Sequence, residues 1–461
     1  APGGFTVAYA GSLEKFENQA KDFGMADFAS NFALSASGLT KPLQFVPDST
    51  LISNNFRLAK SFGSTAIAAG YGLSVLDQDS FAQIQQTNGY NTGKITTNSA
   101  YLNVTSNALS SVGLEGFVKY NNRDNDSTFP AGSLISPSAS EKLGVRIDKI
   151  TTMNYGLAAT FRPTILKSNV TVGWKREDKD RDLTWTLVTV NSIQPQRSLY
   201  KEKTVSDEVY VNWVARPMQG MILRVTPAYV WANETGQVTE PEKAFNLKTK
   251  LSYAASNGML ASGYYNYKNT KNANNALFNN AAFDVATTSI TQDNNKTQQA
   301  AGVSLNMPVS EWINTTASLS CMQDDFATYY LSSDRRRFEV STTSANTLNF
   351  LTRDRSNYNV DTYVLTLGGD WQVTDALRYN GSYTYSQSKG NTASGLILTE
   401  LPTIDGTINN SAHTLTLGGD YALKKGVKLK GSYAYDYYTD KVYSGLTGGY
   451  HTLMLGVTLG F

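Results

Sequence analysis

Cysteine and histidine, the residues that most often hold metals and haem, are scarce in this chain. Its 461 residues include one cysteine, Cys321, and two histidines, His413 and His451. Covalent attachment of a c-type haem needs a Cys-x-x-Cys-His motif, and a disulfide framework or a multi-cysteine metal site needs several cysteines. The sequence also offers no acid/base pair in a plausible pocket and no nucleophile triad. We therefore expect that the chain is not an enzyme and that it carries no cofactor or metal of its own.

Basic residues close to short turns are the remaining candidates for a functional site. A collar of cations at one mouth of a barrel could contact an acidic partner or steer anions. Ordinary solvation, with charges paired across neighbouring strands, is the alternative interpretation, and Asp370 and Asp420 are the nearby acidic counterparts. By strand parity the candidates on the polar side are Arg162, Arg216, Arg224, Lys248, Lys250, Arg378, Lys428 and Lys430.

Three segments mix acidic and basic residues: 123–126 (RDND), 175–182 (KREDKDRD) and 334–337 (DRRR). Oxygen-rich loops can hold calcium, but the EF-hand pattern with its glycine and terminal glutamate is absent. We interpret the segments as solvated loop tips, with docking of an extracellular protein as a second role.

The composition excludes several classes of protein. Charged residues make up 17% of the chain, against roughly 25% in soluble globular proteins. No stretch approaches the roughly 18 consecutive apolar residues of a membrane-spanning helix, and the aromatic and β-branched content argues against wholesale disorder. With 40 basic and 38 acidic residues the net charge is +2, so we expect no nucleic-acid partner.

Apolar and polar residues alternate with a period of two from residue 51 onward, which indicates β-strands. In the last segment, Leu453, Leu455, Val457 and Leu459 share one face with Phe461. The runs last about 10–13 residues, whereas soluble strands have about 5–6 and about 9–11 tilted residues cross a bilayer.

The apolar faces often end in an amphipathic ring, as at Trp174, Trp231, Tyr383 and Tyr435, and such rings form the aromatic girdles of membrane barrels. Short turns alternate with long polar loops, which is typical of bacterial outer-membrane barrels. We therefore predict an all-β protein, a closed antiparallel transmembrane β-barrel in the bacterial outer membrane. The terminal Phe461 resembles the signal read by the barrel-assembly machinery, and the N-terminal APGGF suits a mature secreted chain.

Eight hairpins, a first strand and a closing strand bring the expected total to eighteen, with twenty as the alternative because 13–50 or 328–345 could hide another hairpin. Residues 1–461 would form one barrel. Leu13–Phe28 has some helical character, so we expect 13–50 to be a loop or an inward plug. The expected strands are 5–12, 52–61, 66–76, 96–106, 113–123, 153–162, 168–178, 207–216, 221–232, 244–254, 259–270, 298–307, 313–323, 360–372, 377–388, 411–422, 427–438 and 451–461.

Several stretches resemble the MtrB/PioB family of decahaem-associated outer-membrane proteins. Lys119 to Ser127 (KYNNRDNDS) resembles a family strand that ends in an Arg-Asp-Asn-Asp loop, and Phe161-Arg162-Pro163 resembles its aromatic-Arg-Pro turn. Ala215-Arg216-Pro217 repeats that turn, and Val172 to Arg181 resembles the acidic strand end after it. The Leu-Gly-Gly-Asp and Gly-Ser-Tyr strands near the carboxyl end fit as well, so the resemblance covers roughly residues 100–461. Two departures stand out: the chain is shorter than typical members, and the N-terminal Cys-x-x-Cys of metal-reducing members is absent.

The resemblance implies a sheath. Such barrels hold a periplasmic multihaem c-type cytochrome in the lumen and dock an outer-surface cytochrome on the long loops, so haem is carried by the partners and outer-membrane lipid surrounds the wall. Electrons then pass from haem to haem across the membrane. The alternative is a general or substrate-specific diffusion porin, which needs an inward loop as a constriction, with 271–296 as the candidate. A third hypothesis is that the protein is a structural or adhesive barrel of the cell surface.

Overall fold

The computed structural model describes residues 4–17, 24–25, 41–42, 48–81, 91–127, 144–186, 202–235, 240–280, 285–333, 351–394, 406–424 and 426–459. Within these residues the chain is built almost entirely of strands. No helix there is long and apolar enough to cross a membrane. The two helical segments are single 3₁₀ turns, Ile165–Lys167 and Ser444–Leu446.

Eighteen antiparallel strands form one sheet. They are β1 (Phe5–Phe16), β4 (Ser49–Phe62), β5 (Thr65–Phe81), β6 (Asn91–Ser106), β7 (Val112–Asn125), β8 (Gly144–Phe161), β9 (Asn169–Thr186), β10 (Lys203–Ala215), β11 (Met221–Glu234), β12 (Lys243–Ala254), β13 (Leu260–Asn280), β14 (Val285–Pro308), β15 (Ile313–Ser333), β16 (Leu351–Gln372), β17 (Leu377–Ser394), β18 (Thr407–Lys424), β19 (Val427–Asp440) and β20 (Gly448–Leu459). Each predicted strand corresponds to one of these.

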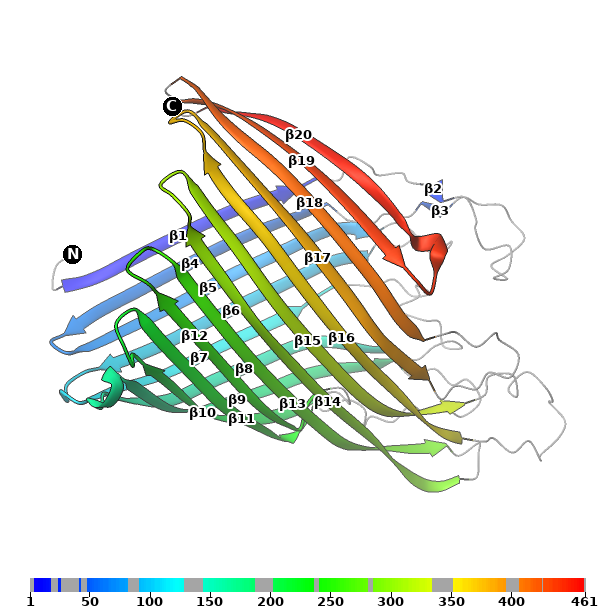
Figure 1. Cartoon of the computed structure of the whole chain (residues 1–461). Coiled ribbons are helices and arrows are strands. Elements are labelled where there is room, and N and C mark those ends of the chain that lie inside the picture. The colour runs from blue at the N-terminus through cyan, green and yellow to red at the C-terminus, as the bar shows by residue number, and fades with distance from the viewer. Residues whose placement is uncertain are drawn as a thin grey trace.

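Strand order follows chain order, because every strand pairs with the next one along the sequence from β1–β4 through to β19–β20. The sheet curls so that β13–β20 lie on one side and β4–β9 on the other, with β10–β12 joining them (Figure 1). Short turns gather at one end, where β1 begins and β20 ends. We call this the short-turn end and the opposite one the long-loop end.

The first and last strands differ from the rest. In the registers of the described residues β1 pairs with β4 alone and β20 with β19 alone, and both strands are exposed at every residue. Their outer edges therefore carry backbone N–H and C=O groups without a strand partner.

The segment 13–50 departs from the helical expectation where the structure describes it. Leu13 to Phe16 continue β1, because they pair with Ser49–Ile52 of β4. The short strands β2 (Gly24–Met25) and β3 (Lys41–Pro42) pair with each other as a separate sheet. The other residues between 18 and 47 lie outside the described residues.

The loop prediction for 271–296 was wrong over most of its length. Strand β13 continues to Asn280 and β14 starts at Val285, with cross-strand pairs such as Asn272–Asn294 and Asn275–Thr291. The candidate constriction loop is thus largely wall. In 328–345, residues 328–333 continue β15, and 334–345 lie outside the described residues.

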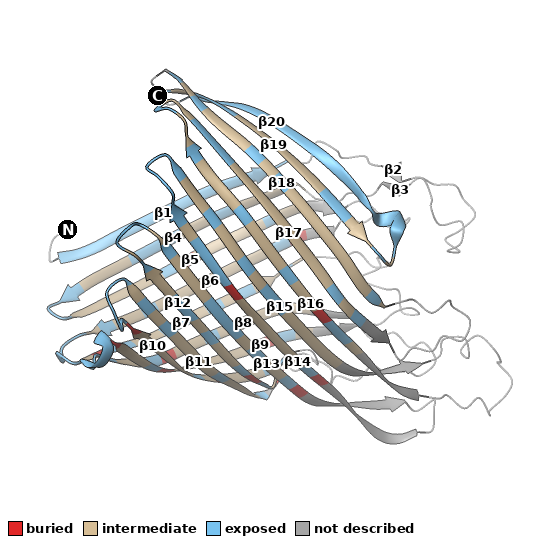
Figure 2. Ribbon diagram, in the orientation of Figure 1, coloured by how far each residue is buried: buried red, intermediate tan, exposed pale blue. Residues whose placement is uncertain are grey.

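The sheet has almost no buried core. Among the described residues the buried apolar side chains are Ala215, Ala244 and Val360, and most of the wall is half-buried or exposed (Figure 2). Large apolar residues instead share one face and stay exposed, for example Leu157 (66% exposed), Val303 and Leu319. On a curved single-layer wall the outer side chains splay apart, so this exposure places the apolar face on the convex side.

Cross-strand tyrosine contacts lie on the apolar face, toward its long-loop side. The Tyr9 hydroxyl donates to Asn54 Oδ1 (2.7 Å), and the Tyr71 hydroxyl donates to Asn98 Oδ1 (2.9 Å). A similar arrangement recurs on β17–β20. There the hydroxyl of Tyr383 lies 2.8 Å from His413 Nδ1, and the hydroxyl of Tyr433 lies 2.8 Å from His451 Nδ1. At the short-turn end, Lys60 Nζ lies 4.1 Å from the Phe5 ring centroid. Amphipathic rings at both ends of an apolar belt are the girdles that the sequence predicts.

We predict that a charge on the convex face destabilises the fold while the same charge one residue along does not. Leu157→Arg should lower the free energy of unfolding in lipid vesicles by about 2–3 kcal/mol, because the guanidinium would enter the apolar belt. Ala158→Arg is the matched control, since Ala158 lies on the polar face directly opposite Glu115. Urea titrations that gave equal losses for the two variants would contradict the assignment of faces.

Candidate functional site

Three of the predicted basic residues lie together on the polar, concave face of β11 and β12. Arg224 stands directly opposite Lys250, and Lys248 stands opposite Thr226. The flanking residues Leu223 and Leu251 are themselves a cross-strand pair on the other face, because successive side chains alternate across a strand. The register therefore places all three cations on the concave face of the sheet.

A fourth cation, Lys268 of β13, extends this cluster. Lys268 pairs in register with Asn246, two residues before Lys248, so it is a diagonal neighbour on the same face. We call Arg224, Lys248, Lys250 and Lys268 the basic arc. The sequence prediction missed Lys268 because it favoured residues close to the turns, although strand parity alone would have placed it on this face.

The basic arc has no acidic counterpart nearby. On β12 and β13, and on β11 from Met221 to Ala232, no acidic residue of the described chain shares its face, and within the described residues none of its four side chains forms an ion pair or hydrogen bond. All four are exposed. Like charges directly opposite each other destabilise a sheet, so the arc depends on solvent or on an external anion for compensation.

The residues near the carboxyl end form a group of mixed charge. The Arg378 guanidinium lies 2.8 Å from Asp370 Oδ1. Asp420 stands between Arg378 on one side and Lys430 on the other in the registers of β17–β19, and Lys428 lies two residues from Lys430 on the same face. This part of the predicted collar matches the alternative interpretation, in which wall charges compensate one another.

The remaining two predicted residues lie in turns. Arg162 Nη2 donates to Asn107 Oδ1 at 2.7 Å, which ties the turn after β8 to the turn before β7. Arg216 follows β10, and its backbone N–H donates to the Leu166 carbonyl at 2.9 Å. The eight predicted residues therefore divide into three arc residues, three in the mixed group and two turn residues. Phe461 lies outside the described residues.

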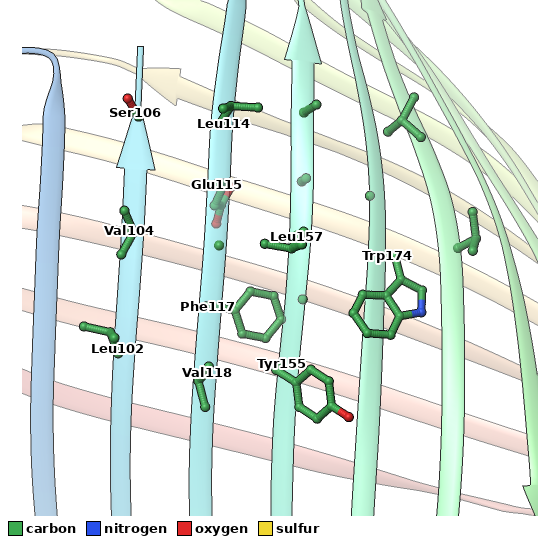
Figure 3. Close-up of a pocket in the computed structure, with 17 residues that line it drawn as sticks. Leu102, Val104, Ser106, Leu114, Glu115, Phe117, Val118, Tyr155, Leu157 and Trp174 are labelled. Atoms are coloured by element: carbon green, nitrogen blue, oxygen red, sulfur yellow. The ribbon is translucent and has the colours of Figure 1, made fainter. Parts of the chain in front are cut away.

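A hollow of about 970 Å³ lies over β6–β10 (Figure 3). Its lining is apolar: Leu102, Leu114, Leu157 and Trp174 project from the convex face. Gly116 lines the same hollow and has no side chain to fill it. The hollow therefore belongs to the apolar belt, although Ser106 and Glu115 are also among its lining residues.

Polar side chains close the long-loop end of that hollow. The Trp174 Nε1–H donates to Asp207 Oδ1 (3.0 Å), and the Tyr155 hydroxyl donates to Asp178 Oδ2 (3.2 Å). Arg176 lies 3.2 Å from Asp178. These contacts pair the charges at the edge of the belt with one another. Among the described residues no group of three or more His, Cys, Asp or Glu side chains is placed to hold a metal ion.

Comparisons with known proteins agree with this architecture. Two solved structures cover the whole chain: the FrpB iron transporter from Neisseria meningitidis (12% identity, 78% of that chain, TM-score 0.51) and a mutant of the ferric enterobactin receptor PfeA from Pseudomonas aeruginosa (9% identity, 76% of that chain, TM-score 0.50). At such low identity they are similar in fold alone. No curated protein matches the chain significantly.

Residues 3–229 match the family model described as "Putative outer membrane beta-barrel porin, MtrB/PioB". The match covers β1 and β4–β10 together with most of β11. It includes the motifs at 119–127, 161–163, 172–181 and 215–217, but not the motifs near the carboxyl end. The resemblance to the MtrB/PioB family, over just under half of the chain, and the outer-membrane location are thus confirmed.

Proposed function

We propose that this protein is a sealed sheath that holds a multihaem c-type cytochrome and insulates a path for electrons across the outer membrane. The observation that carries the proposal is the basic arc, four uncompensated cations that face a space the wall does not fill itself. The family resemblance supplies the identity of the guest.

Closure of the wall is the first element of the proposal. In lipid an unpaired N–H or C=O group costs several kcal/mol, so the free edges of β1 and β20 favour pairing with each other. The two strands run in opposite directions. Both carry their apolar residues at odd positions, Val7, Tyr9 and Leu13 on β1 and Leu453 and Leu455 on β20. Antiparallel pairing of odd with odd positions would continue both faces without interruption.

The size of the lumen is the second element. Barrels of 16–18 strands leave an aqueous channel, because their own side chains cannot fill the interior. On the concave face small residues predominate, for example Ser382, Thr384 and Gly418. Such a wall leaves room for a folded guest.

Charge is the third element. Haem propionates and acidic protein surfaces are anions, and charge complementarity speeds encounter and fixes the register of a complex. The basic arc lies within about six residues of the short-turn end on β11 and β12, which in bacterial barrels is the periplasmic end. A periplasmic guest would meet it on entry.

Cysteine pairs test the closure. In a Cys321→Ala background, we combine Ala8→Cys in turn with Thr452→Cys, Met454→Cys, Gly456→Cys and Thr458→Cys. We expect one or two of these pairs to cross-link on mild oxidation, since a disulfide needs Cα atoms about 4.4–6.8 Å apart. Ala8→Cys with Leu455→Cys is the control, because Leu455 lies on the opposite face. Absence of any cross-link in membranes would refute the seam.

Haem content and conductance test the guest. We expect the barrel purified in mild detergent from native membranes to carry haem absorbance and to conduct ions weakly in planar bilayers. Removal of the guest by a mild denaturant should open a large conductance, because an empty lumen of this width is an aqueous channel. A haem-free barrel that conducts strongly as purified would instead establish the diffusion porin.

Ion selectivity tests the basic arc without any guest. The empty barrel should prefer anions, and a variant with Arg224→Gln, Lys248→Gln and Lys250→Gln should lose much of that preference, since fixed charge sets the local ion concentration. The reversal potential in a KCl gradient measures the change. Asp370→Asn with Arg378→Gln is the control, because removing an ion pair leaves the net charge unaltered. Equal reversal potentials for wild type and the triple variant would exclude the arc from the conducting path.

A further inference from the structure

Four aromatic side chains on the concave face each stand directly opposite a glycine of the neighbouring strand. The pairs are Tyr101–Gly70, Phe117–Gly156, Tyr210–Gly173 and Tyr264–Gly302. Their strand parity is that of the basic arc and opposite to that of the apolar belt. The repetition on four separate strand pairs indicates one shared structural role.

Each ring occupies the place where its glycine would carry a side chain. A Cβ added to Gly302 would lie 2.6 Å from the Tyr264 ring, and one added to Gly156 would lie 2.9 Å from the Phe117 ring. At Gly70 and Gly173 the Cβ would come closer still. Figure 3 shows the Phe117 ring flat against the sheet between β7 and β8. A larger residue at these glycines would push the ring off the wall into the lumen.

Glycine within a strand is less favourable than alanine, because it loses more conformational freedom on folding and has no side chain to pack. An aromatic ring laid across the glycine recovers part of that cost by covering the exposed backbone, the effect known as aromatic rescue. The arrangement also keeps a large side chain from narrowing the lumen.

The four rings lie at one height. Tyr101 and Tyr210 are each five residues from the short-turn ends of β6 and β10, Phe117 is five residues from the start of β7, and Tyr264 is four from the start of β13. Together with their glycines they span the wall from β5 to β14. We call these four residues the seated aromatic level.

Cations flank three of the four rings. Lys175 Nζ lies 4.4 Å from the Tyr210 ring centroid, and Lys119 Nζ lies 5.2 Å from that of Phe117. Lys250 of the basic arc stands directly opposite Tyr264. Lys175 also pairs with Glu208 at 3.1 Å, whereas Lys250 has no acidic partner on its strand pair.

We propose that the residues of the seated aromatic level form the main interface with the guest inside the lumen. We further propose that the guest presents an acidic protein surface to them. This inference rests on the proposed function. Aromatic side chains are enriched at the centres of protein interfaces and are frequent hot spots, and the flanking lysines would give charge complementarity to an acidic surface. Rings that guide a small solute would follow one another along the pore axis, whereas these lie at one height along the part of the wall from β5 to β14.

The test variant removes the three tyrosine rings of the seated aromatic level and keeps the glycines opposite them. A variant with Tyr101→Ser, Tyr210→Ser and Tyr264→Ser is expressed with the native partner proteins, and haem per barrel is measured after mild detergent extraction. We expect retention of the guest to fall by roughly tenfold or more. Tyr438→Ser is the matched control, because Tyr438 shares the concave face but lies near the long-loop end of β19; it should retain the guest.

A second set of variants reports on the rings without a guest. Gly173→Ala should displace the Tyr210 ring and lower the conductance of the empty barrel, and Gly173→Ala with Tyr210→Ser should restore it. Heat-modifiable migration on gels shows which variants are folded, so a misfolded Gly173→Ala leaves the ring-removal variant as the deciding experiment.

The outcomes separate the two proposals. A wild-type barrel without a guest overturns both. A wild-type barrel with its guest, and a folded triple variant that retains that guest equally well, overturns only the role of the seated aromatic level.

Discussion

Backbone hydrogen bonding between successive strands is the constraint on which the rest of this structure depends. A single-layer sheet has no interior, and the described residues include only three buried apolar side chains. Packing therefore cannot hold the wall together as it does in a globular domain. The ladders satisfy the backbone, and the surrounding membrane then takes the apolar face that a second layer would otherwise cover.

The register of the paired strands decides which side chains lie on the concave face. A slip of one residue would exchange the two faces of a strand. The pairing of the neighbouring residues therefore fixes each cation of the basic arc on the concave face. Four of the five register irregularities lie near the long-loop end, for example between Gln78 and Phe81 and between Ile147 and Lys149. Within the apolar belt the pairing is almost uninterrupted, where a lost hydrogen bond would cost most.

The concave face shows two ways of placing charge on a wall. The group of Asp370, Arg378, Asp420 and Lys430 compensates itself, and it needs nothing from the lumen. The basic arc, by contrast, gathers positive charge without compensation and lies beside an aromatic residue seated on a glycine. The two regions of one wall thus differ, with the uncompensated positive charge on β11–β13.

The sequence by itself determined the all-β class, the approximate positions of the strands and the face of the residues in them, because period-two alternation is a local property of the chain, and it left eighteen and twenty strands as alternatives. It did not determine how far the strands run: at 271–296 the alternation of apolar residues ends with the membrane, but hydrogen bonding continues. Nor did it separate the basic arc from the compensated charges or find the seated rings. Those depend on which residues of different strands stand opposite each other, and only the tertiary register decides that.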